Sequence, residues 1–283
     1  MIDLHTHTNE SDGTCTPLEL VDRALAMGLE ALAISDHDTF AGYDQALGPA
    51  REYGLDLVCA IELSARLDGD GTRRRTVHLL GYFLHQPPSI EFRTWLEELQ
   101  AARRERNVRL IAKLQSLGVE IELSEVESIG KTLTGRPHFA RVLIQKGYAG
   151  DWEEAFRKYL GDSAPGFVER EAPDVATGIQ RIISAGGLPA LAHPVRLGIR
   201  NHASEESLIE KLRYEGLKGI EVYHSDHNGS DQARYREIAK KFALAVTGGS
   251  DFHGDVKPGV ALGTGVSGAL NIPRSILDEL RKV

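Results

Sequence analysis

Short apolar runs alternate with helical segments over most of the chain. The first run, Ile2-Asp3-Leu4, leads into His5-Thr6-His7, and the later runs are rich in Ala, Ile, Leu and Val. Such short apolar runs, bounded by helices and turns, are typical of strands buried on both faces. Because buried strands that alternate with helices build parallel sheets or barrels, the pattern predicts an α/β fold. The predicted strands are 2–7, 31–34, 55–61, 76–82, 187–192, 217–223 and 243–250.

The helices between these strands carry recognisable start signals. Thr16 is a candidate N-cap, Pro17 fits the first turn, and Glu19 completes a capping box for a helix that ends at Gly28. A second helix is predicted at 43–53 and a last one at 274–282. The turn signal at 68–71 predicts that the third and fourth strands extend into a hairpin.

The alternation of strands and helices is interrupted in the middle of the chain. One long helical pattern covers 91–117, and shorter ones cover 124–129, 136–146, 151–160 and 174–185. A helical block between two strands is typical of an inserted cap. We therefore predict a barrel domain made of residues 1–88 and 187–283, with residues 89–186 as the helical cap domain.

Composition and charge narrow the function classes. The chain has 283 residues, enough for one large α/β domain with an insertion. Its net charge of -8 argues against unspecific coating of nucleic acid but leaves room for a small basic pocket. Only Cys15 and Cys59 are available, so we expect a cytoplasmic protein without a disulfide framework. No apolar run approaches the roughly 20 residues of a membrane span, and neither a signal sequence nor an obligate protein partner is evident.

Nitrogen and oxygen ligands fall at or near the ends of the predicted strands. Residues two apart in an extended chain share a side, so His5 and His7 are expected to point into one site. The carboxyl ends of barrel strands gather at one rim, so ligands from different strands would meet there. Nine candidates exceed what one ion needs, which predicts two or three divalent ions. The nine are His5, His7, Asp12, His37, Glu62, His78, His193, Asp251 and His253.

Together these motifs resemble those of the PHP (polymerase and histidinol phosphatase) family. The resemblance rests on His5-x-His7, Ser35-Asp36-His37, Glu62, Ala192-His193-Pro194 and Ser250-Asp251-Phe252-His253. It implies a distorted seven-stranded (β/α) barrel that carries three divalent metals and hydrolyses phosphate esters. It also implies a division of the ligands among the ions. The first ion would take His5, His7, Glu62 and Asp251, the second Asp12, His37 and Glu62, and the third His78, His193 and His253.

Asp12 departs from the family pattern, because many members have a histidine at this position. A carboxylate there shifts the site towards harder metals, so Mn²⁺ is favoured, with Fe²⁺ or Zn²⁺ as alternatives. Metals about 3.5–4 Å apart can bridge a water and lower its pKa towards neutrality. The predicted nucleophile is therefore a metal-bridging hydroxide, held by Glu62, Asp12 and Asp251.

A segment of the helical block resembles a motif of the nucleotide-acting PHP subgroup: Thr134-Gly135-Arg136-Pro137-His138. Gly135 and Pro137 predict a turn at a helix start, where free N–H groups favour an anion. The preceding helix offers further donors in Arg103, Arg104, Arg106 and Asn107, although an arginine-rich helix is more often a solvated face. The predicted substrate contacts are Arg136, His138, Arg104, Asn107 and Thr134.

The resemblance to that subgroup implies removal of the 3′-phosphate from a 3′,5′-nucleoside bisphosphate such as pAp, which leaves AMP. The alternative is a 5′-to-3′ exoribonuclease on short 5′-phosphorylated RNA, which needs the same grip on a 5′-phosphate. Histidinol-phosphate phosphatase and a non-catalytic PHP module are the remaining alternatives. The expected partner is thus a small phosphorylated nucleotide or a short RNA.

Three residues after or within the sixth strand have no ligand position in the family pattern. We expect Glu221 and His224 to support the ligands or to pack. We expect His227, in a polar loop, to be solvated.

Overall fold

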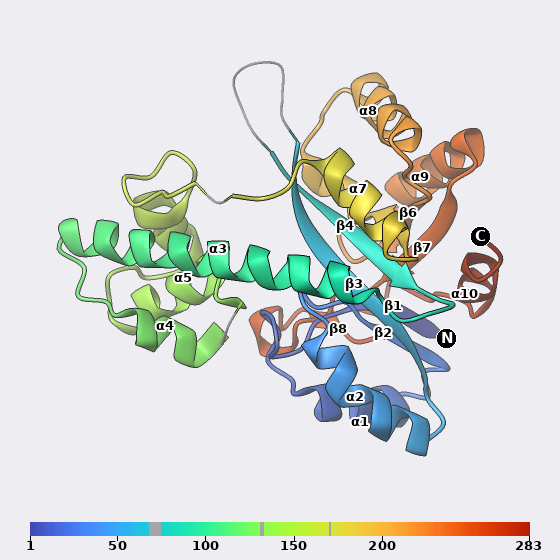
Figure 1. Ribbon diagram of the computed structural model, residues 1–283, viewed down its shortest axis with the longest axis horizontal. Helices are drawn as coiled ribbons and strands as arrows, with labels where there is room; N and C mark the ends of the chain where they lie inside the picture. Colours follow the sequence, from blue (N-terminus) through green and yellow to red (C-terminus); the bar gives the residue numbers. More distant parts are fainter. Residues whose placement is uncertain (68–74, 131–132, 170) are drawn as a thin grey trace.

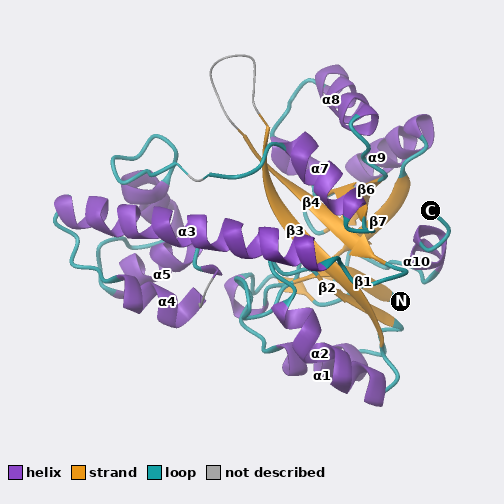
Figure 2. Cartoon of the chain, in the orientation of Figure 1, coloured by secondary structure: helices purple, strands orange, loops and turns teal. Residues whose placement is uncertain are grey.

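A computed structural model describes residues 1–67, 75–130, 133–169 and 171–283 (Figure 1). Figure 2 shows a strand core surrounded by helices, with a second group of helices projecting to one side. The predicted turn at 68–71 lies outside the described residues. In the described part of the chain, no helix is both long and apolar enough to cross a membrane.

Seven strands form one sheet in the order of the sequence, β1-β2-β3-β4-β5-β6-β7. All residues of the first two strands are buried, as the continuous apolar runs predict. The strands are β1 Ile2–Thr6, β2 Ala31–Ile34, β3 Asp56–Leu67, β4 Arg75–Phe83, β5 Leu188–Leu191, β6 Gly219–His224 and β7 Ala245–Gly249.

Strand β4 departs from the parallel arrangement that the alternation of strands and helices predicts. This strand runs antiparallel to both β3 and β5, whereas the other neighbouring pairs are parallel. Only seven residues, 68–74, separate β3 from β4, which is too short for the dozen or more residues of a parallel crossover. The predicted pairing of the third and fourth strands as a hairpin is confirmed, with Cys59–Leu67 opposite Arg75–Phe83.

The barrel nearly closes where β1 meets β7. The amide of Asp251 donates to the carbonyl of His5 over 2.8 Å, and the amide of His7 donates to that of Phe252 over 2.9 Å. Gly249 permits this approach, because a Cβ at residue 249 would lie 2.3 Å from the backbone nitrogen of His5. The predicted seven-stranded α/β barrel is therefore confirmed.

Helices cover the outside of the barrel (Figure 1). The capping box of α1 forms as predicted between Thr16 and Glu19. The apolar faces of α7 and α9 bury Ile179 and Ile238 against the strands. The barrel helices are α1 Pro17–Ala26, α2 Ala41–Glu52, α7 Val175–Ser184, α8 His202–Tyr214, α9 Gly229–Phe242 and α10 Ser275–Leu280.

One long helix, α3 (Ile90–Ser116), joins the barrel to a smaller helical group. Its first turns bury Phe92 and Leu96 in the barrel core, and its last turns bury Leu110 and Leu114 in a separate core. That second core also includes α4 (Leu123–Gly130), α5 (Arg136–Gln145), α6 (Trp152–Ala155) and a π-helical turn, Phe156–Leu160. The helical block is thus a cap, as the sequence pattern indicates. The predicted cap segment ends at residue 186 and so includes α7, but α7 packs on β3, β4 and β5 of the barrel. The division at residue 186 therefore stays a prediction.

Candidate metal centre and substrate cavity

His5 and His7 project from the end of β1 into the barrel mouth, where both are fully buried. Their Nε2 atoms lie 3.2 and 3.1 Å from one oxygen of Glu62, Oε2. The same nitrogens lie 3.5 and 3.4 Å from Oδ1 of Asp251, which follows β7. Four candidate ligand atoms, from the end of β1, from within β3 and from the segment after β7, therefore lie within 4.8 Å of one another.

Glu62 is shared between groups of ligands. While Oε2 faces β1, its other oxygen, Oε1, lies 2.7 Å from Nδ1 of His78 and 2.8 Å from Nε2 of His193. The antiparallel direction of β4 explains why His78 takes part. In an antiparallel strand it is the first residues, and not the last, that lie at the rim where the parallel strands end.

Asp12 forms a third meeting point, in the loop after β1. Its Oδ1 lies 3.2 Å from Nε2 of His253, and its Oδ2 lies 3.6 Å from Nε2 of His37. This grouping differs from the division of ligands implied by the resemblance. His253 joins Asp12 and His37, while His78 groups with Glu62 and His37, and His193 contacts the same oxygen of Glu62 as His78. The nine predicted ligands therefore come together, but in a different partition.

The chemistry of this donor set fits divalent metal ions. Nε2 of His5 and of His7 and Nδ1 of His37 are buried without a hydrogen-bond partner, although each faces a carboxylate oxygen. Burial holds the pKa of His37 at about 3 and that of His193 at about 4, so both are neutral, as a metal ligand must be.

The carboxylates of Glu62, Asp12 and Asp251 are stabilised by positive charge around them. Burial alone would raise the pKa of Glu62, but the imidazoles around it outweigh burial and hold that pKa well below its usual range. Burial likewise lowers the pKa of His7, yet its contacts with Asp251 and Glu62 raise it to about 9. Without metal, protonated imidazoles balance the acids, and divalent cations would take over this balance.

Glu221 orients two of the ligands from within β6. Its Oε1 lies 2.9 Å from Nδ1 of His5, and its Oε2 accepts a hydrogen bond of 2.7 Å from the amide of His193. His224, the last residue of β6, has Nε2 3.4 Å from Oδ2 of Asp251. Both residues contact the ligands that we expected them to support. His227 is buried, not solvated, with Nδ1 2.8 Å from the carbonyl of Val222.

Backbone strain marks the same rim. Asp38, His193 and Asp251 have φ angles of 51°, 25° and 56°, in a region that side chains other than glycine rarely occupy. Strained residues of this kind persist where the surroundings fix them, and they cluster at functional sites. The sequence carries no signal for these conformations.

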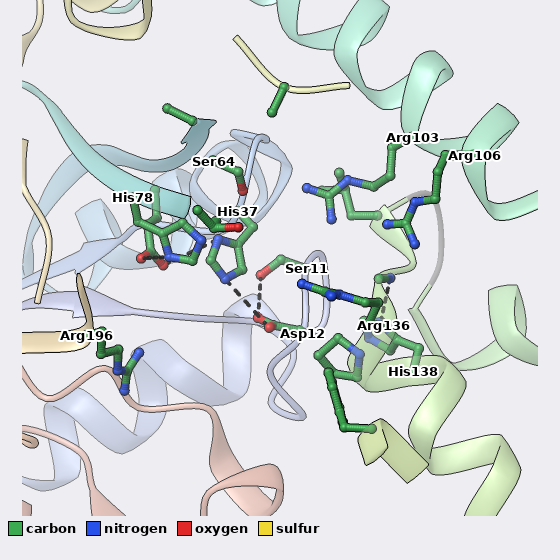
Figure 3. A pocket seen from close by; sticks show the side chains of 18 of the residues that line it. Ser11, Asp12, His37, Ser64, His78, Arg103, Arg106, Arg136, His138 and Arg196 are labelled. Carbon is green, nitrogen blue, oxygen red and sulfur yellow. Dashed lines mark hydrogen bonds and ion pairs between the residues drawn. The ribbon is translucent and has the colours of Figure 1, made fainter. Parts of the chain in front are cut away.

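A cavity of about 670 Å³ opens above the ligand cluster. Figure 3 shows His37, His78 and Asp12 on one side, with Arg103, Arg106, Arg136 and His138 from the cap facing them. The barrel and the cap therefore each supply one wall. The volume is within the usual range for a small-molecule site, about 300–1,000 Å³.

Two of the five predicted substrate contacts line the cap wall. Arg136, at the start of α5, pairs with Asp162 over 2.7 Å. His138 is buried and accepts a hydrogen bond of 3.0 Å at Nδ1 from the amide of Gly135, which leaves Nε2–H as its donor. Arg103 and Arg106 line the same wall, and Arg103 forms an ion pair with Asp38.

The other three predicted contacts do not lie on the cavity wall. Arg104 is 59% exposed on another face of α3 and pairs with Glu127 over 2.8 Å. Asn107 is buried and donates to the carbonyl of the equally buried Thr134 over 2.8 Å. These two residues connect α3 to the start of α5 and so position the cap wall.

Two cations on the barrel wall were missed by sequence reasoning. Arg196 Nη2 and Lys257 Nζ lie 2.8 and 2.7 Å from Oδ2 of Asp251, the oxygen turned away from His5 and His7. Arg196 is also held by Asp226 over 2.7 Å. Both cations line the cavity. The position of Arg196 three residues after His193 was the available signal.

Comparisons with known proteins agree with this geometry. The model of the PHP domain family matches residues 3–161. A 5′-3′ exoribonuclease of Haemophilus influenzae is 33% identical over 252 residues, which cover 89% of each chain. A 3′,5′-nucleoside bisphosphate phosphatase of Chromobacterium violaceum is 32% identical over 89% of this chain and 87% of its own. A solved structure from Bifidobacterium adolescentis, described as a metal-dependent phosphoesterase, has a TM-score of 0.82 at 31% identity and covers 100% of this chain and 96% of its own.

Proposed function

This chain belongs to the PHP domain family and is a metal-dependent phosphoric ester hydrolase; we propose that it removes the 3′-phosphate from 3′,5′-nucleoside bisphosphates. The reaction would convert pAp to AMP and phosphate. The reaction is an ordinary hydrolysis of a phosphate ester, in which water supplies the oxygen that leaves with the phosphorus.

One observation carries the proposal. The same cavity has a cluster of metal ligands on one wall and the cations of the cap on the other. A substrate with two separate phosphates satisfies both walls at once. A substrate with one phosphate leaves the arginines of the cap without an anionic partner from the ligand.

The barrel wall would hold the phosphate that reacts. The overlapping groups of candidate ligands suit two or three divalent ions, with Mn²⁺ favoured by the Asp12 carboxylate. When bound, such ions supply an activated water and offset the charge of the phosphoryl group. Arg196 and Lys257 would donate to the phosphoryl oxygens from beside Asp251, because both reach the cavity surface there.

The cap wall would hold the 5′-phosphate. Arg136 and the Nε2–H of His138 are donors at the start of α5, and Arg103 and Arg106 add positive charge from α3. Burial lowers the pKa of His138, so it binds as a neutral donor at neutral pH. Arginine suits this task because its planar group binds two phosphate oxygens together.

A 5′-to-3′ exoribonuclease is the second candidate. The similarity to the Haemophilus influenzae relative supports it, and the same cap cations would hold the 5′-phosphate of an RNA. The scissile bond would then be a diester that continues into the next nucleotide.

The cytoplasmic location stays a prediction that rests on cysteine content.

A substrate panel separates these candidates. Purified protein with Mn²⁺ is given pAp, 3′-AMP, 5′-AMP, histidinol phosphate and a 5′-phosphorylated RNA pentamer. The proposal expects fast phosphate release from pAp and slow release from the three monophosphates. Stepwise release of mononucleotides from the RNA, without turnover of pAp, would favour the exoribonuclease. Preference for histidinol phosphate would overturn both.

A further inference from the structure

The cap wall of the cavity contains an exposed tryptophan. Trp152 begins α6, lines the same cavity as the metal ligands and is 40% exposed. In the part of the chain that the structure describes, its indole has neither a hydrogen bond nor a ring contact. An open indole leaves a large apolar surface in water. Packing of the cap therefore does not account for the position of this side chain.

The other tryptophan behaves differently. Trp95, on α3, packs against the ring of Phe92 at 5.5 Å between centroids and lies beneath the guanidinium of Arg181 at 5.2 Å. It belongs to the barrel core and does not line the cavity. Trp95 is therefore packed against the barrel core, whereas Trp152 lines the open cavity.

Further aromatic rings lie beside the proposed phosphate donors. Phe156 and Phe167 line the cavity and flank the guanidinium of Arg136, at 5.9 and 5.8 Å from their ring centres. Phe156 starts a π-helical turn directly after α6, and such turns are frequent at functional sites. Arg136 therefore places the cationic and the aromatic parts of the cap wall next to each other.

We propose that Trp152, supported by Phe156 and Phe167, is the subsite for the nucleobase, which stacks on the indole. This deepens the proposed function and rests on it for the nucleotide nature of the substrate. In a nucleotide the base lies one ribose away from the 5′-phosphate, and Trp152 lines the same cavity as Arg136. Every base has a π-face, so stacking binds all four bases and gives little sequence preference.

Intrinsic fluorescence tests binding without turnover. Trp95→Phe leaves Trp152 as the sole tryptophan, and a chelator keeps the protein inactive. We expect pAp to quench the fluorescence in a saturable way, whereas the base-free 1,3-propanediol bisphosphate leaves it unchanged. Equal quenching by both compounds, or no change with pAp, would overturn the base subsite.

Kinetics test the same subsite in the metal-loaded protein. Trp152→Leu is expected to raise KM for pAp by about 5- to 150-fold, the effect of losing one base–aromatic stack, while kcat stays constant. KM for the base-free bisphosphate should not change, and Trp152→Phe should restore most of the affinity for pAp. An unchanged KM for pAp in Trp152→Leu would contradict the proposal.

The two experiments distinguish failure of the subsite from failure of the function. Quenching by pAp without its hydrolysis would retain the base subsite and reject the bisphosphatase. Hydrolysis of pAp without quenching, and with an unchanged KM in Trp152→Leu, would retain the bisphosphatase and reject the base subsite.

Discussion

Glu62 contacts candidate ligands that come from four different segments of the chain. Its two oxygens face imidazoles from β1, from the loop after β2, from β4 and from the loop after β5. A carboxylate in this position would set the spacing between neighbouring ions in the proposed metal centre. Its function therefore depends on the side chains that hold those imidazoles in place, and Glu221 is the clearest of them.

Glu221→Gln should weaken metal binding without disrupting the barrel. The amide keeps the shape of the side chain but removes the negative charge beside Nδ1 of His5. Loss of such an orienting partner typically costs about 10- to 100-fold in metal affinity or activity. We expect the Kd for Mn²⁺, measured by isothermal titration calorimetry, to rise within this range.

Glu205→Gln is the matched control for this experiment. Glu205 is as buried as Glu221 but binds Arg234 and the hydroxyl of Tyr235, between α8 and α9. Its substitution should lower the free energy of unfolding and leave the Kd for Mn²⁺ unchanged. An equal Kd in Glu221→Gln and wild type would show that Glu221 does not orient the ligands.

The cluster of candidate metal ligands could be predicted from the sequence because its signals are local. His5 and His7 share a side of one strand, and Asp251 and His253 follow another. Their partition could not be predicted, because it depends on how loops from different strands meet. The cations beside Asp251 were missed for the same reason: Lys257 reaches Asp251 only through the fold of its loop.

At the scale of the elements, the closure of β7 onto β1 determines whether His5 and His7 face Asp251. Gly249 lies at this junction, and any side chain there would meet the backbone of His5. Overpacking of a tight interior costs about 1–3 kcal/mol. We therefore expect Gly249→Ala to lower the free energy of unfolding, measured in urea, by about 1–3 kcal/mol and to reduce the amount of bound Mn²⁺.

Gly229→Ala serves as the control for Gly249→Ala. Gly229 is exposed at the start of α9, and apart from its chain neighbours and its own helix backbone no atom lies within 4 Å of an added Cβ. Because alanine in a helix is favoured over glycine by roughly 0.5–1 kcal/mol, Gly229→Ala should not destabilise the protein. Unchanged stability and metal content in Gly249→Ala would contradict the tight closure.

The C-terminal helix is attached to the barrel by a carboxylate. Asp56, at the start of β3, binds Arg281 through two bonds of 2.9 and 2.8 Å and also binds Arg274. Burial would raise the pKa of Asp56, but the two arginines outweigh it and lower that pKa below its ordinary value of 3.8. The ionised form therefore stabilises the folded state.

Asp56→Asn should lower the free energy of unfolding by about 0.5–1 kcal/mol at pH 6, as expected for a partly exposed ion pair. The folded pKa lies below the unfolded value, so this contribution is complete above the unfolded value of 3.8 and is lost as the pH falls through the lower, folded value. Urea titrations of the metal-free protein at pH 6 and pH 3 should show the difference shrink. A constant difference would reject the ion-pair explanation.

Element boundaries were predictable where chemistry is local, as at the capping box of α1. The antiparallel pairing of β4 with β5 was not predictable, because β5 comes about a hundred residues after β4. The double role of α3 was also missed. Its sequence reads as one continuous helix, and only tertiary packing assigns its first half to the barrel.

At the scale of the whole molecule, α3 holds the cap over the barrel so that the two proposed phosphate-binding walls face one cavity (Figures 1 and 3). Arg106 on this helix lines the cavity, whereas Arg104 points elsewhere. Arg106→Met should raise KM for pAp by about 10- to 100-fold, the effect of losing a charge-assisted hydrogen bond. KM for 3′-AMP, which lacks the 5′-phosphate, should stay the same.

Arg104→Met is the matched control, because it removes the same charge from the same helix away from the cavity. It should leave both KM values unchanged. Equal effects of the two substitutions would mean that the cap acts through its overall charge and not through a built phosphate site.

The most direct test is to identify which phosphate leaves pAp. The protein is incubated with pAp and Mn²⁺, with a chelated sample as the blank, and the nucleotide product is resolved by chromatography. The account predicts 5′-AMP and one equivalent of phosphate, with no release in the chelated sample. Release of 3′-AMP, or equal turnover without metal, would contradict a barrel wall that hydrolyses the 3′-phosphate while the cap retains the 5′-phosphate.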